Sequence, residues 1–196
     1  MYIPRGADLR SVMDVYKLMG FNGAFGSVDC THINWRRCPV SLTNFCIGKE
    51  NTPTLSFLCV VDHSKRKMVC SDAYCGAAND KQIVKVVPEM HALFSGLLED
   101  VQYKLYKAEG NEIVVQGAYL IADGGFLRFG CVVDPSHLLH SMEQTRWSKF
   151  LSLFEKMLSV LLAFLKFVFG FFFIPRSCIL LKTFLMFSNV VPFYTT

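Results

Sequence analysis

Two aspartates carry the chemistry that this sequence suggests most directly. Asp29 follows an apolar segment that contains two glycines, and Asp123 follows a second apolar segment and precedes Gly124. Carboxylate oxygens at the ends of adjacent strands are ligands that suit Mg²⁺ or Mn²⁺. Two such ions, ~4 Å apart, hold the attacking and leaving oxygens in phosphoryl transfer. The alternative is that Asp123 is an ordinary turn residue, as an aspartate before glycine often is.

Helix and strand patterns indicate which elements would position these carboxylates. Apolar residues recur at helical spacing in residues 9–19, which predicts an amphipathic helix. An apolar strand over residues 21–28 would present Asp29 at its tip. Residues 55–61 and 68–74 are typical of two strands joined by a polar turn, and we expect them to form a hairpin.

A helix is expected between this hairpin and the next strand. Apolar residues at helical spacing predict it over residues 81–98, and either Asn79 or Asp80 can accept a hydrogen bond from its first turn. Pro88 has no backbone N–H, so we expect a kink or a break there.

The last part of the region would return the chain to the first strand. The polar segment 98–112 is expected to be an irregular connection, and residues 113–122 to be a strand, interrupted by Gly117. A three-strand meander, a helix and then a parallel strand beside the first would make Asp29 and Asp123 neighbours.

Five short motifs occur in one order along residues 21–151. The first is GSVDCTHI at residues 26–33, followed by GKE with a proline (48–53), GAAND (76–80), ADGGF (122–126) and WSKFL (147–151). In this order they resemble motifs of the PIF/Harbinger-type DDE transposases, whose first motif is G-x-x-D-G-T-H-I. Cys30 stands where that motif has its second glycine.

The resemblance implies a fold, a chemistry and a partner. The family has an α/β, ribonuclease-H-like mixed sheet with flanking helices, and its two aspartates and one glutamate bind Mg²⁺ or Mn²⁺ to cut DNA in the nucleus. Carried over, the aspartates are Asp29 and Asp123. Asp80 matches a family aspartate that we interpret as a structural helix cap. His32 lies just past the first aspartate and either faces the site or packs in the core.

The family's third carboxylate has no counterpart in this reading frame. The resemblance places it near Leu158 and Ser159, neither of which is acidic. Removing one carboxylate from a two-metal site is expected to impair or abolish the nuclease activity. The alternative is an active nuclease in which Glu143, Glu155 or another acid substitutes.

A frame slip near residues 151–153 would explain the missing glutamate. Residues 154–160, FEKMLSV, can be encoded by codons that read VRKDVEC in the neighbouring frame, which resembles the family's motif around that glutamate. Residues 186–196 can be re-read in the same way as NVFQCCTILHN, which resembles the family's distal helix. We therefore expect residues 1–20 to be an N-terminal helix and linker, 21–151 a truncated catalytic domain, and 152–196 an out-of-frame apolar helical tail.

The tail also supports a different class of function, a membrane-anchored protein without enzymatic activity. Ten of the eighteen phenylalanines lie beyond Ser152, and no acidic residue follows Glu155. Residues 157–174 are long and apolar enough for a transmembrane helix candidate, although Lys166 near its middle would cost about 2.5–3.5 kcal/mol.

The eight cysteines occur without any CxxC pair, so the usual zinc and thioredoxin-like signatures are missing. Cys30, Cys38 and Cys46 recur every eight residues and are either metal ligands or small buried apolar side chains. The N-terminus has no apolar signal segment, so we expect a protein that is not secreted and keeps free thiols in a reducing compartment.

Composition and charge exclude some classes of protein but do not identify one. An apolar share of 52% and a charged share of 18% exclude a disordered tail protein and a coiled coil. The net charge of +4 permits a nucleic-acid partner without requiring one. The basic run 65–67 is either a solvated turn or a phosphate contact, and WRR at 35–37 either contacts DNA or pairs a packed Trp35 with exposed arginines. The sequence is silent on the oligomeric state.

Overall fold

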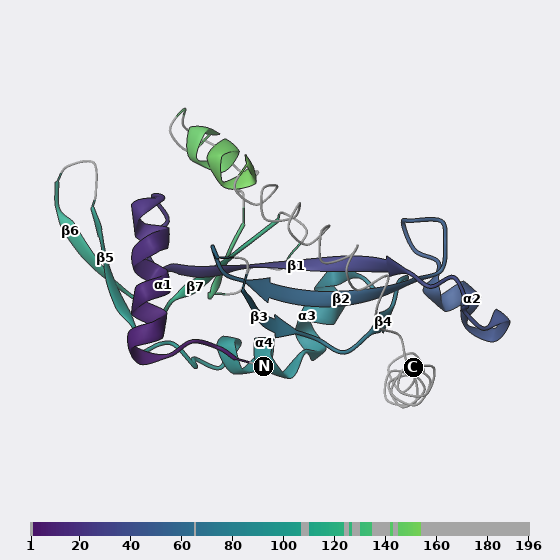
Figure 1. Cartoon of the computed structure of the whole chain (residues 1–196). Helices are drawn as coiled ribbons and strands as arrows, with labels where there is room; N and C mark the ends of the chain where they lie inside the picture. Colours follow the sequence, from purple (N-terminus) through teal and green to yellow (C-terminus); the bar gives the residue numbers. More distant parts are fainter. Residues whose placement is uncertain are drawn as a thin grey trace, which may run out of the picture.

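The computed structural model describes residues 2–64, 66–106, 110–123, 126, 130–134, 142 and 145–153. Its helices are α1 (Gly6–Leu18), α2 (Val40–Cys46), α3 (Asp80–Val86) and α4 (Pro88–Phe94), and residues 145–153 are also helical. Its strands are β1 (Ala24–Asn34), β2 (Thr54–Val61), β3 (Lys67–Cys70), β4 (Tyr74–Cys75), β5 (Gln102–Tyr106), β6 (Glu112–Gln116), β7 (Tyr119–Ala122) and β8 (Val132–Val133). The described residues therefore form a mixed α/β fold (Figure 1).

The central sheet has the strand order β3-β2-β1-β7-β8, and β4 also pairs with β2. Strands β1, β2 and β3 form an antiparallel meander. Strand β7 runs parallel to β1, and β8 runs parallel to β7. This arrangement confirms the predicted order of a three-strand meander, a helical connection and a parallel strand beside the first.

Helix α1 packs onto the sheet and shares its core. Its buried residues, Leu9, Val12, Met13 and Tyr16, recur at the spacing of one helix face. They belong to one hydrophobic cluster with residues of β1, β2 and β7. The segment 1–20, which the sequence set apart as a helix and linker, therefore contributes α1 to the core of the same domain.

The helix predicted over residues 81–98 is two short helices. Val87 between them has extended backbone angles, φ −76° and ψ 119°, because the ring of Pro88 disfavours helical angles in the residue before it. Pro88 then begins α4, where its missing N–H has no partner to lose. The side chain of Asn79 caps α3 by accepting a hydrogen bond from the Lys81 N–H at 2.9 Å.

Two predictions are wrong: segment 98–112 is not an irregular connection throughout, and segment 113–122 is not one continuous strand. Strand β5 lies within the expected connection and pairs with β6 in a separate two-stranded sheet. The expected strand 113–122 breaks at Gly117, whose φ of +89° turns the chain and whose N–H donates to the Val101 carbonyl at 2.8 Å. As a result β6 joins the hairpin beside α1, whereas β7 joins the main sheet (Figure 1).

Several short elements carried too weak a pattern to be predicted. Helix α2 lies at the opposite end of β1 from α1 (Figure 1). Its residue Cys46 belongs to a second hydrophobic cluster, together with Trp35, Leu55 and Cys75. The expected strand 68–74 is divided into β3 and β4. Strand β8 has only two residues, too few for an alternation to be recognised.

Several sequence predictions fall outside the described residues. These include the positions of the missing glutamate, Leu158 and Ser159, its substitutes Glu143 and Glu155, and the apolar segment 157–174. Within the described part of the chain, no helix is long and apolar enough to cross a membrane.

Candidate functional site

The structure brings Asp29 and Asp123 to neighbouring strands. The parallel pairing of β1 with β7 includes Val28 opposite Ala122, and the two aspartates are the next residue on each strand. Adjacent strands lie ~4.8 Å apart, so the backbones of the two aspartates are side by side. Both residues are half-buried, at the carboxyl end of the parallel pair.

Asp29 does not lie at a strand tip as predicted, because β1 continues to Asn34. Its second half stays paired with β2, from Asp29 opposite Cys59 to Asn34 opposite Thr54. Thr31 and Ile33 lie in this half, and β-branched residues favour extended backbone. Asp29 therefore lies within a strand that β2 supports along its whole length, at the level where β7 ends. This is a more rigid position than the predicted tip.

The carboxylate of Asp29 has a defined local contact. Its Oδ1 accepts a hydrogen bond from the backbone N–H of Cys30 at 2.7 Å. The register also places Asp29 in one row with Cys59 on β2 and Cys70 on β3. Residues that lie directly opposite one another on paired strands share a face of the sheet.

His32 belongs to the other face of the sheet. It lies three residues after Asp29 on a strand whose pairing with β2 is regular, and side chains alternate between faces at each step. Its ring is buried, with Nε2 3.9 Å from Asp80 Oδ1 and Nδ1 3.5 Å from Thr54 Oγ1. Of the two sequence interpretations, the structure favours packing in the core.

Asp80 is not the helix cap that we predicted. Asn79 fills that role, and Asp80 begins α3, where a negative charge suits the helix dipole. Its carboxylate lies between His32 and Lys49. Oδ1 is 3.9 Å from His32 Nε2, and Oδ2 is 3.9 Å from Lys49 Nζ. Asp80 thus links three of the motifs that the sequence analysis identified.

Two glycines explain why those motifs meet. A Cβ added to Gly48 would lie 2.2 Å from the carbonyl oxygen of Gly76. One added to Gly76 would lie 1.9 Å from Thr54 Oγ1 and 2.7 Å from the Cys46 carbonyl oxygen. Only residues without a side chain allow this approach of backbones. Both glycines belong to predicted motifs, but nothing in their local sequence indicates that they pack together.

The family of plant transposon proteins matches residues 1–155. The chain belongs to this family. No curated protein and no solved structure is significantly similar to the chain. The family match confirms the transposon origin that the motifs indicated.

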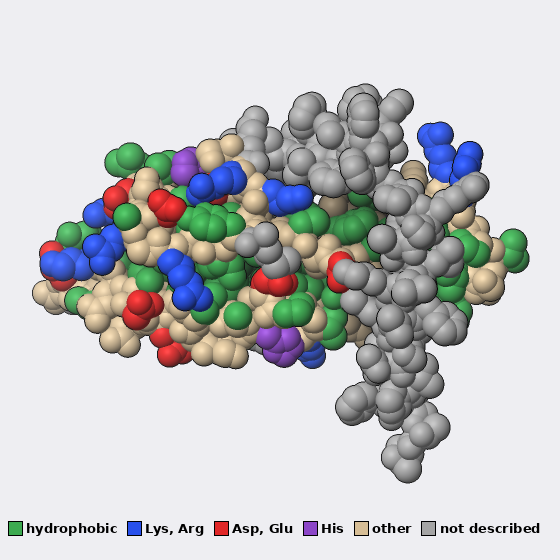
Figure 2. Space-filling view, turned by 60° about the horizontal axis from the view of Figure 1, so that its bottom comes forward, with side chains coloured by type: hydrophobic (Ala, Val, Ile, Leu, Met, Phe, Trp, Pro, Cys, Tyr) green, Lys and Arg blue, Asp and Glu red, His purple; other side chains and the backbone are tan. Residues whose placement is uncertain are grey.

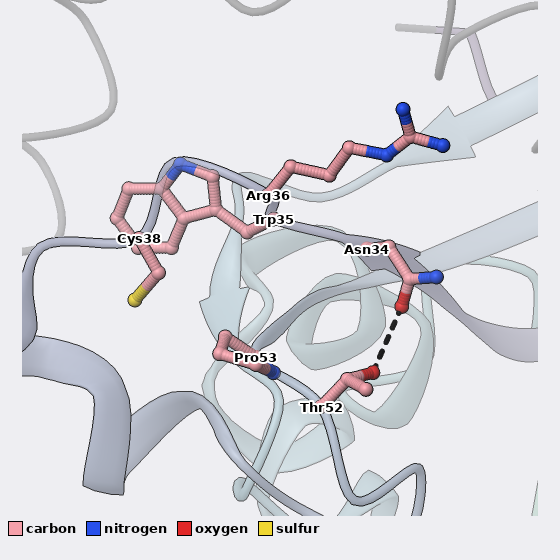
Figure 3. A pocket seen from close by; sticks show the side chains of 6 residues that line it. All are labelled: Asn34, Trp35, Arg36, Cys38, Thr52 and Pro53. Atoms are coloured by element: carbon pink, nitrogen blue, oxygen red, sulfur yellow. Dashed lines mark hydrogen bonds between the residues drawn. The ribbon is translucent and has the colours of Figure 1, made fainter.

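A cavity of this plant transposon protein lies away from the two aspartates. It has a volume of about 280 Å³ and is lined by Asn34, Trp35, Arg36, Cys38, Thr52 and Pro53. Thr52 Oγ1 donates to Asn34 Oδ1 at 3.1 Å across it, while the Arg36 side chain extends away from the indole (Figure 3). The described residues of its lining include no acidic or histidine side chain, and Cys38 is the one thiol among them, so the cavity holds no carboxylate pair of the kind formed by Asp29 and Asp123.

The WRR motif of this transposon protein is explained by packing. Trp35 is 9% exposed and belongs to the second hydrophobic cluster, whereas Arg36 and Arg37 are exposed. In the other basic run, Lys65 lies outside the described residues, and Arg66 Nε donates to Asp62 Oδ2 at 3.0 Å. Figure 2 shows basic and acidic side chains interspersed on the visible face rather than gathered in one basic surface.

The cysteines of the protein do not form the three-residue cluster that their spacing allowed. Cys46 lies beside Cys75, with 3.4 Å between the sulfur atoms, whereas Cys30 packs in the main core on β1. Among the described residues, no three His, Cys, Asp or Glu side chains are grouped to hold a metal ion. Asp29 and Asp123 are thus a pair without a third ligand in the described part of the chain.

Proposed function

We propose that this plant transposon protein is the catalytic domain of a PIF/Harbinger-type DDE transposase that has lost its third carboxylate. In this proposal the fold is ribonuclease-H-like, and Asp29 and Asp123 hold Mg²⁺ or Mn²⁺. The ancestral activity is metal-dependent cleavage of DNA in the nucleus. This chain retains the metal-binding pair but is impaired or inactive as a nuclease.

The parallel pairing of β1 with β7 carries this proposal. It is the one contact that makes neighbours of two aspartates from opposite ends of the domain, at the carboxyl end of both strands. Binding sites of mixed and parallel α/β sheets lie at the carboxyl ends of strands. The sheet order β3-β2-β1-β7-β8 supports the fold that the motifs imply.

The donor atoms suit a hard divalent cation. Both candidate ligands are carboxylates, and Mg²⁺ is typically bound through one or two carboxylates, together with water and phosphate oxygens. A bound metal would polarise a phosphoryl oxygen and activate water. Asp29 and Asp123 would hold it, and the hydrogen bond from the Cys30 N–H would orient the Asp29 carboxylate.

The extent of the family match supports the loss of the third carboxylate. The match ends at residue 155, close to the predicted frame slip at 151–153 and before Leu158 and Ser159. With two carboxylates instead of three, a metal would bind weakly and a second metal would lack a ligand. We therefore expect metal binding without efficient DNA cleavage.

Calorimetric titration of the full chain with Mn²⁺ tests the metal site. We expect weak binding that is lost in both Asp29→Asn and Asp123→Asn, because each removes one of two charged ligands. Asp14→Asn is the matched control, since Asp14 is exposed on α1. Unchanged Mn²⁺ binding in the two site variants would refute the proposed ligands.

Nicking of supercoiled plasmid with Mg²⁺ tests the loss of activity and its cause. The chain as it stands should not nick, whereas a chain whose coding frame is shifted by one base after residue 151 should regain the activity. That activity should disappear in Asp29→Asn. Sequencing of the gene and transcript across codons 145–196 is the direct check, and a neighbouring frame without a glutamate-containing motif would contradict the frame slip.

A further inference from the structure

A pair of cysteines lies at the free edge of the central sheet. Cys59 on β2 and Cys70 on the edge strand β3 are directly opposite each other, and the Cys59 thiol donates a hydrogen bond to the Cys70 sulfur at 3.6 Å. Cys59 is 5% exposed and Cys70 is half-buried. Both are free thiols.

The backbone hydrogen bonds show that this pair has the geometry of a cross-strand disulfide. The N–H of Ser71 donates to the Leu58 carbonyl at 2.9 Å, so Leu58 and Ser71 are a hydrogen-bonded pair. Hydrogen-bonded and non-hydrogen-bonded pairs alternate along an antiparallel ladder. Cys59 and Cys70 are therefore a non-hydrogen-bonded pair, with Cα atoms ~4.5 Å apart, inside the range that a disulfide spans.

The surroundings of Cys70 favour its thiolate. The hydrogen bond from Cys59 and the charge of Lys67 lower the pKa of Cys70, against burial and the charge of Asp72. The same hydrogen bond, together with burial, raises the pKa of Cys59. Cys70 is also the more exposed thiol of the pair, since Cys59 is 5% exposed and Cys70 is half-buried, so a peroxide reaches Cys70 first.

We propose that Cys70 and Cys59 form an oxidation site in which a peroxide converts the two thiols to a disulfide that joins β3 to β2. The Cys70 thiolate attacks one oxygen of hydrogen peroxide, the O–O bond breaks, and the hydroxide that leaves takes up a proton as water. Cys70 is then a sulfenic acid. The Cys59 sulfur attacks the Cys70 sulfur, the S–O bond breaks, and the hydroxyl group leaves with the Cys59 proton as a second water. The Cys70 thiolate and the Cys59 thiol together lose two electrons and one proton, the solvent supplies the second proton, and the peroxide is reduced to two waters.

A second cysteine pair provides an internal control. The sulfur atoms of Cys46 and Cys75 are 3.4 Å apart, closer than those of Cys59 and Cys70. Burial raises the pKa of Cys46 to about 12 and also raises that of Cys75. If proximity alone decided the reaction, Cys46–Cys75 would oxidise first. If the presence of a thiolate decides the reaction, the Cys59–Cys70 pair oxidises first.

Peptide mapping of the full, reduced chain after stoichiometric hydrogen peroxide at pH 7 tests the proposal. Free thiols are blocked with N-ethylmaleimide before digestion with trypsin and mass spectrometry. Cys70 and Cys75 share the peptide 68–81, and the partner peptide distinguishes the two pairs: 50–65 carries Cys59, whereas 38–49 carries Cys46 together with Cys38, which fragment ions within that peptide tell apart. We expect the 50–65 link to form at least about tenfold faster than the 38–49 link, because the thiolate is the reactive species.

Variants separate the two steps. In Cys59→Ser, Cys70 should accumulate as a sulfenic acid that dimedone labels, whereas Cys75→Ser should leave the Cys59–Cys70 disulfide unchanged. Equal rates for the two pairs, faster formation of Cys46–Cys75, or a Cys70 that stays reduced would each overturn the proposal. The parent chain alone gives this result, so the proposal stays testable if a variant fails to fold. The peroxide experiment is run without added metal, so its result does not depend on whether Asp29 and Asp123 bind a metal ion.

Discussion

The turn between β2 and β3 depends on one buried carboxylate, Asp62. The residue is fully buried and accepts four hydrogen bonds, from Ser64 N–H and O–H at 2.9 and 2.7 Å and from Arg66 N–H and Nε–H at 2.9 and 3.0 Å. Burial alone would raise the pKa of Asp62, but these hydrogen bonds outweigh it and lower the pKa below its usual value. The carboxylate is therefore charged and stabilised in the fold.

Replacing Asp62 by alanine should lower the free energy of unfolding by about 2–4 kcal/mol. A hydrogen bond to a charged group contributes ~1.5–3 kcal/mol. The bonds are not additive here, since water can replace Asp62 at the turn N–H groups. The ion pair adds at most ~1 kcal/mol because the Arg66 side chain is 49% exposed. Asp62→Asn keeps the shape of the side chain and loses its charge, so it should lower the free energy of unfolding by about 1 kcal/mol.

Urea denaturation followed by far-UV circular dichroism measures both variants, with Asp14→Asn as the exposed control. The pH dependence gives a second check. A group whose pKa is lowered in the fold stabilises it fully above its unfolded pKa, 3.8 for Asp62, and this contribution is lost as the pH falls through the folded value. The difference between the parent and Asp62→Asn should therefore be constant from pH 7 to pH 5 and vanish in more acidic solution. A change below about 0.5 kcal/mol for Asp62→Ala at pH 7 would refute this account of the turn.

Three further predictions follow from contacts elsewhere in the domain. Gly76→Ala should unfold at clearly lower urea concentration because its Cβ would meet backbone oxygen atoms, whereas Gly130→Ala, with open space around the added Cβ, should not. Alkylation of Cys70 by iodoacetamide, followed by peptide mapping, should reach half its maximal rate at a lower pH than alkylation of Cys46, because Cys59 and Lys67 lower the pKa of Cys70 whereas burial raises that of Cys46; the reverse order would contradict this. Phe150→Ala should cost about 1–2 kcal/mol in the same urea assay, because its ring stacks on Phe21 with centroids 5.3 Å apart.

The sequence sufficed for elements whose residues alternate or recur clearly. Local sequence patterns predict the apolar face of α1, the continuous apolar strand β2 and the break before Pro88. Tertiary contacts do not alter these elements. The adjacency of Asp29 and Asp123 could be expected because the element order admits few sheet topologies. The length of β1 could not be predicted, because its second half is fixed by pairing with β2 rather than by its own sequence pattern.

Local patterns failed where distant contacts decide the structure. Gly117 divides an apparently continuous strand because its N–H reaches the Val101 carbonyl and the chain turns. The contact of Lys49 and His32 with Asp80 depends on Gly48 approaching Gly76, which are far apart in the sequence. A glycine that provides space for a distant backbone has the same local signature as a glycine in a turn.

The two aspartates lie apart from the side chains that build the hydrophobic core. Asp29 and Asp123 lie at the rim of the parallel pair, and the hydrophobic cluster beneath them is built from other side chains, such as Val28 and Ala122. The core is also closed by Leu151, which is fully buried and precedes the position where the third carboxylate is expected. If the proposed function holds, loss of that carboxylate would remove a metal ligand while Leu151 and the rest of the described core stay in place.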